Sequence, residues 1–167
     1  YLAFLFKKNL LADIPHRPDY TYRDDRMLIL EVALRSPKIA IHDGYALKHR
    51  VHGNDRLQFN SGLKQDVQNF QHLNIYKHIL KKLSSRGDIN KRRIAASVKI
   101  LWPLAHWIAI HHPDEAVAVI NWIYELEPDF VIPEKGLLGL LYNKMGFDKT
   151  ERLLRFRRTL RKTLGFK

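Results

Sequence analysis

The pattern of apolar and polar positions divides the chain into two parts. Residues 1–60 contain short apolar runs separated by turns, whereas residues 61–167 carry apolar side chains mostly at helical spacing. We therefore predict an α+β chain that is mostly α, with a mixed domain over 1–60 and a helical domain over 61–167. The polar, turn-rich stretch around residue 60 marks the predicted boundary.

The first part predicts short strands around one helix. Residues 1–6 form an apolar run typical of a strand, and the residues after it favour a short helical segment. Apolar side chains spaced at helical intervals after Asp24 predict a helix that starts at this residue. Residues 38–42 and 45–51 are typical of two extended segments joined by an Asp-Gly turn.

The second part predicts consecutive helices with short connections, which is the arrangement of a helical bundle. Gly87 is suited to end the first helix, and Asp88 or Asn90 to start the second. Pro103 is expected to kink or split this second helix, because proline removes a backbone hydrogen bond. The later helices are predicted from His112 to Leu126, from Leu137 to Met145 with an end at Gly146, and from Asp148 to Leu164.

Composition indicates a folded and strongly basic protein. Hydrophobic residues make up 46% of the 167 positions, which is enough for a core. No apolar run approaches the roughly 20 residues needed to span a bilayer. The formal charge of +12 predicts attraction to polyanions such as nucleic acid, anionic lipid or phosphorylated substrates. The lack of cysteine excludes disulfides and thiolate zinc sites, and it fits a reducing compartment.

The acidic pair Asp24-Asp25 is the first candidate for catalysis. Both carboxylates are expected in the first turn of a helix, where the unpaired backbone N–H groups stabilise them. A carboxylate at a rigid helix start is also well placed to point into a cleft and act as a general base. The alternative is that the two acids only stabilise the helix end, and their spacing alone favours this alternative.

The order of these segments resembles the acceptor-side half of inverting family-2 glycosyltransferases, which have the GT-A fold. In that family an acidic pair starts a helix like the one expected over residues 24–33. A strand that ends in an Arg-x-His turn follows, as in Tyr45 to Gly53. Upstream, residues 3–11 are similar to the strand and short helix that precede the acidic pair. The resemblance covers about the first third of the chain and implies that this part is a remnant of a GT-A domain.

The resemblance implies roles for five residues. Asp25 matches the carboxylate that takes the proton from the acceptor hydroxyl, and Asp24 stands where the family more often has glutamate, so the roles within the pair stay open. His52 is implied as a ligand of a divalent cation, Mn²⁺ or Mg²⁺, that bridges the donor diphosphate. Arg50 and His49 are implied near the same diphosphate. The alternative is that Arg50 and His52 only form the solvated face of a strand.

Two motifs of a complete transferase are missing from the sequence. It has no Asp-x-Asp metal motif and no glycine-rich phosphate loop. We therefore expect the acceptor-side and C-terminal part of a larger transferase, incomplete and inactive alone. The implied activity is inverting transfer of a sugar from a nucleotide-sugar donor to a hydroxyl of a saccharide or lipid-linked acceptor. Synthesis of an envelope polysaccharide or a glycoconjugate is the implied setting.

The last helix carries a separate signal. Over residues 151–164, six basic side chains share a helix with five apolar ones. Such a helix can lie on an anionic membrane surface, which would place the protein in the cytoplasm at the inner face of the membrane. The alternative is that the apolar side chains pack on the bundle and the basic ones are solvated. The three tryptophans are expected in the core: Trp102, Trp107 and Trp122.

Two other functions are weighed against sugar transfer. A basic helical module that binds nucleic acid fits the charge, but the sequence has no helix-turn-helix, RNA-recognition or zinc signature. Nucleic acid is therefore not the expected partner. The other alternative is a helical scaffold that retains only a remnant of the transferase fold, and formation of a homo-oligomer stays open.

Overall fold

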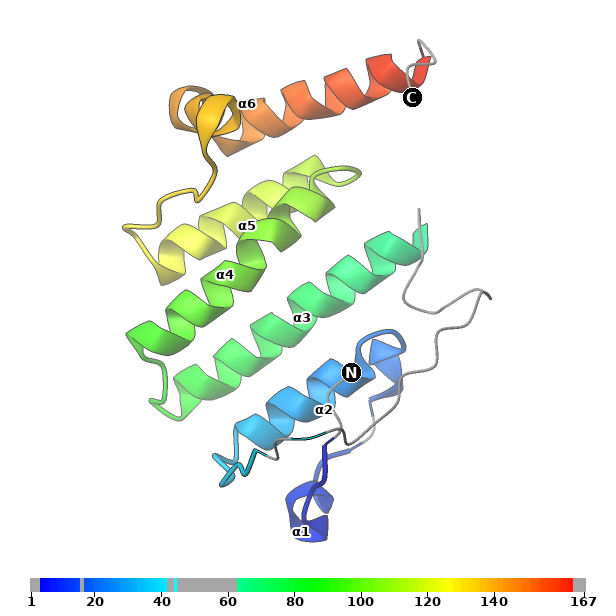
Figure 1. Cartoon of the computed structure of the whole chain (residues 1–167), viewed down its shortest axis with the longest axis vertical. Coiled ribbons are helices and arrows are strands. Elements are labelled where there is room, and N and C mark those ends of the chain that lie inside the picture. The colour runs from blue at the N-terminus through cyan, green and yellow to red at the C-terminus, as the bar shows by residue number, and fades with distance from the viewer. Residues whose placement is uncertain (1–3, 16, 42–43, 45–62, 164–167) are drawn as a thin grey trace. The chain divides into compact units, whose positions relative to one another are not determined.

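The computed structural model describes residues 4–15, 17–41, 44 and 63–163, and their regular structure is helical (Figure 1). The chain divides into two units, Tyr1–Ser85 (unit 1) and Arg86–Lys167 (unit 2). The mostly helical class predicted from the sequence is confirmed. The boundary predicted near residue 60 falls outside the described residues and stays a prediction.

Unit 1 is built around two helices that lie side by side. A short helix α1 (Lys8–Leu11) and the 3₁₀ helix η1 (Pro18–Tyr20) precede α2 (Asp24–Ala33), and α2 contacts the long helix α3 (Leu63–Ser85) (Figure 1). Buried apolar side chains come from η1, α2 and α3: Tyr20, Met27, Val32, Leu73, Ile75, Ile79, Leu80 and Leu83. These side chains form the core that orients the start of α2.

The strands predicted in the first part are not found among the described residues. Residues 4–6 and 38–41 have no regular secondary structure, and residues 1–3, 42 and 45–51 lie outside the described part. Ile39 and Ile41 are 83% and 88% exposed. The apolar side chains that suggested a half-buried strand are therefore exposed. Such a pattern specifies a strand only where the apolar side chains are covered, and here they are not.

Unit 2 contains α4 (Lys91–Ile108), α5 (Pro113–Leu126) and α6 (Gly136–Thr163), with α4 and α5 side by side (Figure 1). The side chain of Asn90 accepts a hydrogen bond from the Arg93 N–H at 3.0 Å, so Asn90 caps α4 as predicted. Helix α4 continues through Pro103, which excludes the predicted split at that residue.

Helix α6 is interrupted where the sequence predicts an end. Gly146 has φ +76° and ψ 174°, a conformation that breaks the helical path and is essentially restricted to glycine. The two predicted helices that meet near this residue are therefore confirmed as two segments of α6. In the described part of the chain, no helix is both long enough and apolar enough to cross a membrane.

An aromatic cluster packs in unit 2. Trp102 contacts the rings of Phe130, Tyr142 and Phe147 at centroid distances of 6.0, 5.3 and 5.8 Å, and its indole N–H donates to Glu134 at 3.2 Å. Of the three tryptophans expected in the core, Trp102 is buried, Trp122 is half-buried, and Trp107 is 45% exposed. The core prediction is thus confirmed for Trp102 and wrong for Trp107.

A buried carboxylate joins α4 to α6. Glu151 is 1% exposed, and its Oε1 accepts hydrogen bonds from Tyr142 and, at 2.5 Å, from His106 Nδ1. Because an ionised carboxylate only accepts, this contact places a proton on Nδ1. Nε2 of the same ring lies 3.5 Å from Arg158 Nη2. Burial and the neighbouring Glu151 carboxylate raise the pKa of Tyr142, so its hydroxyl stays a donor.

Candidate active site at the start of helix α2

The start of α2 is fixed by the turn that precedes it. The backbone N–H of Arg23 donates to the carbonyl of Tyr20 at 2.8 Å, and the N–H of Met27 donates to the carbonyl of Arg23 at 3.0 Å. Tyr20 is buried, and the Arg17 guanidinium stacks over its ring at 5.1 Å while binding Asp19 through two hydrogen bonds. These contacts fix the residue at which α2 begins, Asp24.

The two predicted acids lie in the first turn of α2, and both are exposed. Asp24 Oδ1 accepts a hydrogen bond from the Asp25 N–H at 2.8 Å, and Asp25 Oδ1 accepts one from the Arg26 N–H at 2.7 Å. These bonds satisfy two of the backbone donors that a helix start leaves unpaired. The predicted position of the pair is confirmed, and an exposed carboxylate is accessible to an acceptor molecule.

Gln71 joins the turn before α2 to α3. Its side-chain Oε1 accepts from the Tyr22 N–H at 3.1 Å, and its Nε2 donates to the Asp19 carbonyl at 3.1 Å. One amide side chain therefore holds the backbone of η1 at Asp19 and the backbone of the turn after it at Tyr22. The start of α2 cannot shift along α3 without breaking both bonds.

The side chain of Arg26 contacts α3. Its Nη1 lies 3.2 Å from Nε2 of His72, whose side chain is 6% exposed. Burial first, and then the charges of Arg26 and Arg23, lower the pKa of His72 to about 4. The neutral ring then accepts from Arg26 through Nε2, which leaves the proton on Nδ1. The His72 and Tyr76 rings lie 5.4 Å apart in a tilted arrangement.

A second polar cluster holds the far half of α2. Glu31 accepts hydrogen bonds from Lys82 at 2.6 and 2.9 Å and contacts His78 Nε2 at 2.8 Å. Burial alone raises the pKa of Glu31, but the hydrogen bonds from Lys82 and His78 outweigh it and leave the pKa below its usual value. Helix α2 is therefore bound to α3 near both of its ends, and Asp25 occupies a defined place in unit 1.

The predicted phosphate and metal residues cannot be placed beside the acids. His49, Arg50 and His52 lie outside the described residues, so their predicted roles stay predictions. Among the residues that the structure does describe, no group of three or more His, Asp and Glu side chains is arranged to hold a metal ion.

Sequence reasoning missed the residues of α3 that hold α2. Gln71, His78 and Lys82 recur with Ile75 at spacings of four, three and four residues, so all four fall on one side of a helix. Polar side chains repeated at helical spacing beside an isoleucine could have indicated that this side of the helix contacts another element. Their partners, Asp19, Tyr22 and Glu31, are 47 to 52 residues away in the chain, and helical spacing does not identify them.

Comparisons with known proteins add no family to these observations. Neither the models of protein families, nor the curated proteins, nor the solved structures gave a match to this chain.

Proposed function

We propose that this chain is the acceptor-side and C-terminal part of an inverting glycosyltransferase, with Asp25 as the general base. The observation that carries the proposal is an exposed acidic pair at the start of a helix that hydrogen bonds hold in place from α3. The order of sequence motifs that resembles family-2 glycosyltransferases supports the same assignment. A GT-A remnant over residues 1–60 belongs to the proposal.

In the proposed reaction, Asp25 accepts the proton of an acceptor hydroxyl. The hydroxyl oxygen forms a bond to the anomeric carbon of the donor sugar as the bond from that carbon to the diphosphate breaks. The nucleoside diphosphate leaves, and attack from the opposite side inverts the anomeric configuration. Asp25 is favoured over Asp24 because it is the second acid of the pair. The donor is a nucleotide sugar, and the acceptor is a saccharide or a lipid-linked molecule.

Binding of the donor diphosphate is assigned to Arg50 and His49, and a divalent cation, Mn²⁺ or Mg²⁺, to His52. Mn²⁺ and Mg²⁺ prefer oxygen ligands, so a histidine nitrogen would supply at most one ligand beside them. The sequence lacks Asp-x-Asp, and the described residues offer no cluster of ligands. The residues at hand therefore do not make a complete cation site, and no step of the reaction is routed through the ion.

A sugar-transfer assay on the full-length gene product tests the proposal. Replacing a general base lowers the rate by roughly 10² to 10⁴-fold, so we expect Asp25→Asn to lower kcat by that factor. Asp13→Asn makes the same charge change at another exposed acid of unit 1 and is expected to leave kcat unchanged. Equal turnover by Asp25→Asn and the wild type would remove Asp25 from the reaction.

A further inference from the structure

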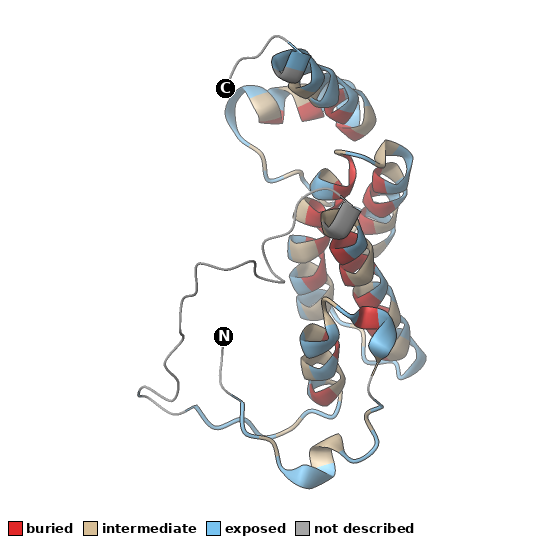
Figure 2. Cartoon of the chain, turned by 90° about the vertical axis from the view of Figure 1, so that its right-hand side faces the viewer, coloured by how far each residue is buried: buried red, intermediate tan, exposed pale blue. Residues whose placement is uncertain are grey.

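The second segment of α6 exposes a strip of apolar side chains. Leu153, Phe156 and Leu160 are 43%, 62% and 43% exposed. At about 100° per residue, the three positions lie within roughly 60° of one another around the helix, so they form one continuous surface, which we call the apolar strip. Among its described residues, this segment has no buried residue after Glu151, and Figure 2 shows the helix that leads to the C-terminus as largely exposed.

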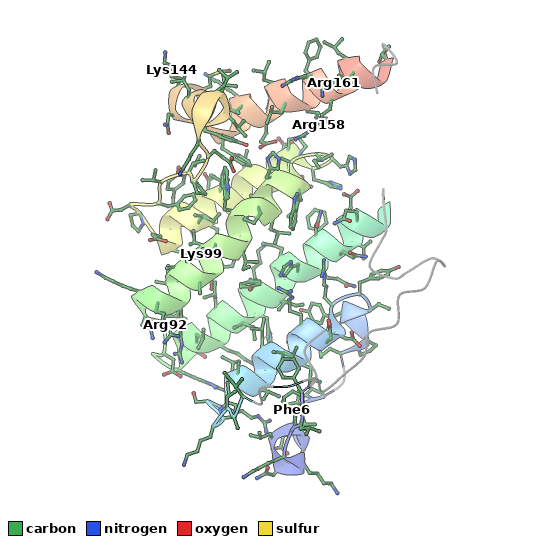
Figure 3. All side chains as sticks on the ribbon, in the orientation of Figure 1. Phe6, Arg92, Lys99, Lys144, Arg158 and Arg161 are labelled. Carbon is green, nitrogen blue, oxygen red and sulfur yellow. The ribbon has the colours of Figure 1, made fainter. Side chains whose placement is uncertain are left out.

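The opposite side of the same segment packs inside unit 2. Thr150 and Glu151 are buried, and Arg158 contacts His106 of α4. Figure 3 shows Arg158 on the side of α6 that faces α4 and α5. The helix is therefore held in unit 2 by residues other than the apolar strip. The alternative that the apolar side chains pack on the bundle is met only in part, because Leu154 is half-buried whereas Leu153, Phe156 and Leu160 are exposed.

Basic side chains surround the apolar strip. Residues 148–163 hold seven basic and two acidic residues, a net charge of +5. Lys149, Arg157 and Arg161 are exposed beside the strip, and the Arg161 position near the end of α6 is labelled in Figure 3. Arg152 is held by Asp148 at 2.6 Å and Asp114 at 3.1 Å. An apolar strip with cationic edges matches the boundary between lipid headgroups and acyl chains.

We propose that this face of α6 binds the surface of an anionic lipid bilayer, with the apolar strip inserted at the level of the headgroups. Leu153, Phe156 and Leu160 would leave water for the acyl boundary, while Arg157 and Arg161 reach the lipid phosphates. A second copy of the chain fits less well, because a two-fold contact through the strip would bring two sets of arginines together. Nucleic acid would use the cations but leave Phe156 exposed to water.

Sedimentation with vesicles tests the proposal on the full chain. The vesicles contain phosphatidylcholine alone or phosphatidylcholine with about one-third phosphatidylserine. We expect the wild type to bind the anionic vesicles and the triple variant Leu153→Ser, Phe156→Ser, Leu160→Ser to bind them at least tenfold more weakly. Arg157→Gln with Arg161→Gln should lose about fivefold for each charge removed, and only on anionic vesicles.

A matched control replaces three exposed apolar residues elsewhere in unit 2. Val131→Ser, Leu137→Ser and Leu140→Ser remove side chains that are 76%, 74% and 48% exposed, and this variant is expected to bind vesicles like the wild type. Far-UV circular dichroism checks that both triple variants keep their helices. Vesicle binding does not require sugar transfer, so failure of one proposal leaves the other standing.

Three results would overturn the proposal. The first is equal binding of anionic vesicles by the wild type and the apolar-strip variant. The second is binding of a DNA or RNA duplex with a steep salt dependence, together with no vesicle binding. The third is concentration-dependent self-association that the apolar-strip variant loses, again without vesicle binding.

Discussion

At the level of single residues, His72 is the side chain whose protonation the fold controls most strongly among the described residues of unit 1. Its pKa is lowered to about 4 from an ordinary value of 6.5. Between these pH values the unfolded chain binds more protons than the folded one, so the free energy of unfolding falls as the pH drops from 6.5 towards 4. The full loss is about 3 kcal/mol.

We expect this loss to depend on the His72 ring. Urea unfolding at pH 7 and pH 4.5 should show a smaller loss of stability for His72→Gln than for the wild type, because glutamine stays neutral at both pH values. A proton NMR titration of the His72 ring measures the same shift directly. A ring that titrates near pH 6.5 would contradict the described burial beside Arg26.

In unit 2, Glu151 is a buried carboxylate that accepts hydrogen bonds from two side chains. Replacing it by alanine leaves the buried Tyr142 hydroxyl and His106 Nδ1 without their acceptor, and we expect a loss of about 2–3 kcal/mol. Asp148→Ala removes an acid of the same helix whose ion pair with Arg152 is exposed to solvent, so we expect a much smaller loss. Urea unfolding followed by the near-UV signal of the Trp102 cluster measures both. Equal losses for the two variants would rule out a special role for the buried carboxylate.

At the scale of helices and turns, Gly146 determines the course of α6. Its φ of +76° with ψ 174° suits glycine only, whereas Gly87 has φ +66° at the end of α3, where asparagine is also tolerated. A side chain at either position would meet nothing within 4 Å, so backbone strain decides the outcome. We expect Gly146→Asn to lower stability by about 1–3 kcal/mol and Gly87→Asn to cost less. Thermal unfolding of the two variants is the measurement, and the reverse order would contradict the described break in α6.

The cap of α4 gives a second prediction at this scale. Asn90→Ala removes the acceptor of the Arg93 N–H and is expected to lower the free energy of unfolding by about 1 kcal/mol. Asn90→Ser keeps a capping oxygen and serves as the control, with little expected change. Denaturant unfolding of the two variants distinguishes them, and an unchanged Asn90→Ala protein would show that the cap adds nothing to stability.

Helix boundaries could be predicted from the sequence because local chemistry determines them. Asn90, Pro113 and Gly146 each mark a boundary through their own backbone or side chain. A strand needs a neighbouring strand that can be distant in the chain. The apolar pattern around Ile39 and Ile41 does not indicate whether such a neighbouring strand exists. This is why the helices of the described residues were predicted well, whereas the extended segments predicted at residues 4–6 and 38–41 are not strands.

At the scale of the whole molecule, the candidate site could be predicted only in part. The position of Asp24 and Asp25 follows from local helix-start chemistry and is found as expected. The contacts that fix this helix start, through Gln71 and His72, join residues 46 to 52 positions apart, and helical spacing does not identify such pairs. The charge of +12 likewise did not distinguish between partners, whereas the exposure of Phe156 favours a lipid surface.

We propose that the exposed carboxylate of Asp25 takes a proton from a sugar acceptor. The most direct test compares kcat for sugar transfer by the full-length gene product carrying Asp25→Asn with that of the same protein carrying Asp24→Asn. Both changes remove one charge from the first turn of α2, so both weaken the helix start to a similar degree. We predict a loss of roughly 10² to 10⁴-fold for Asp25→Asn and a much smaller one for Asp24→Asn. Wild-type turnover by Asp25→Asn would exclude Asp25 as the general base.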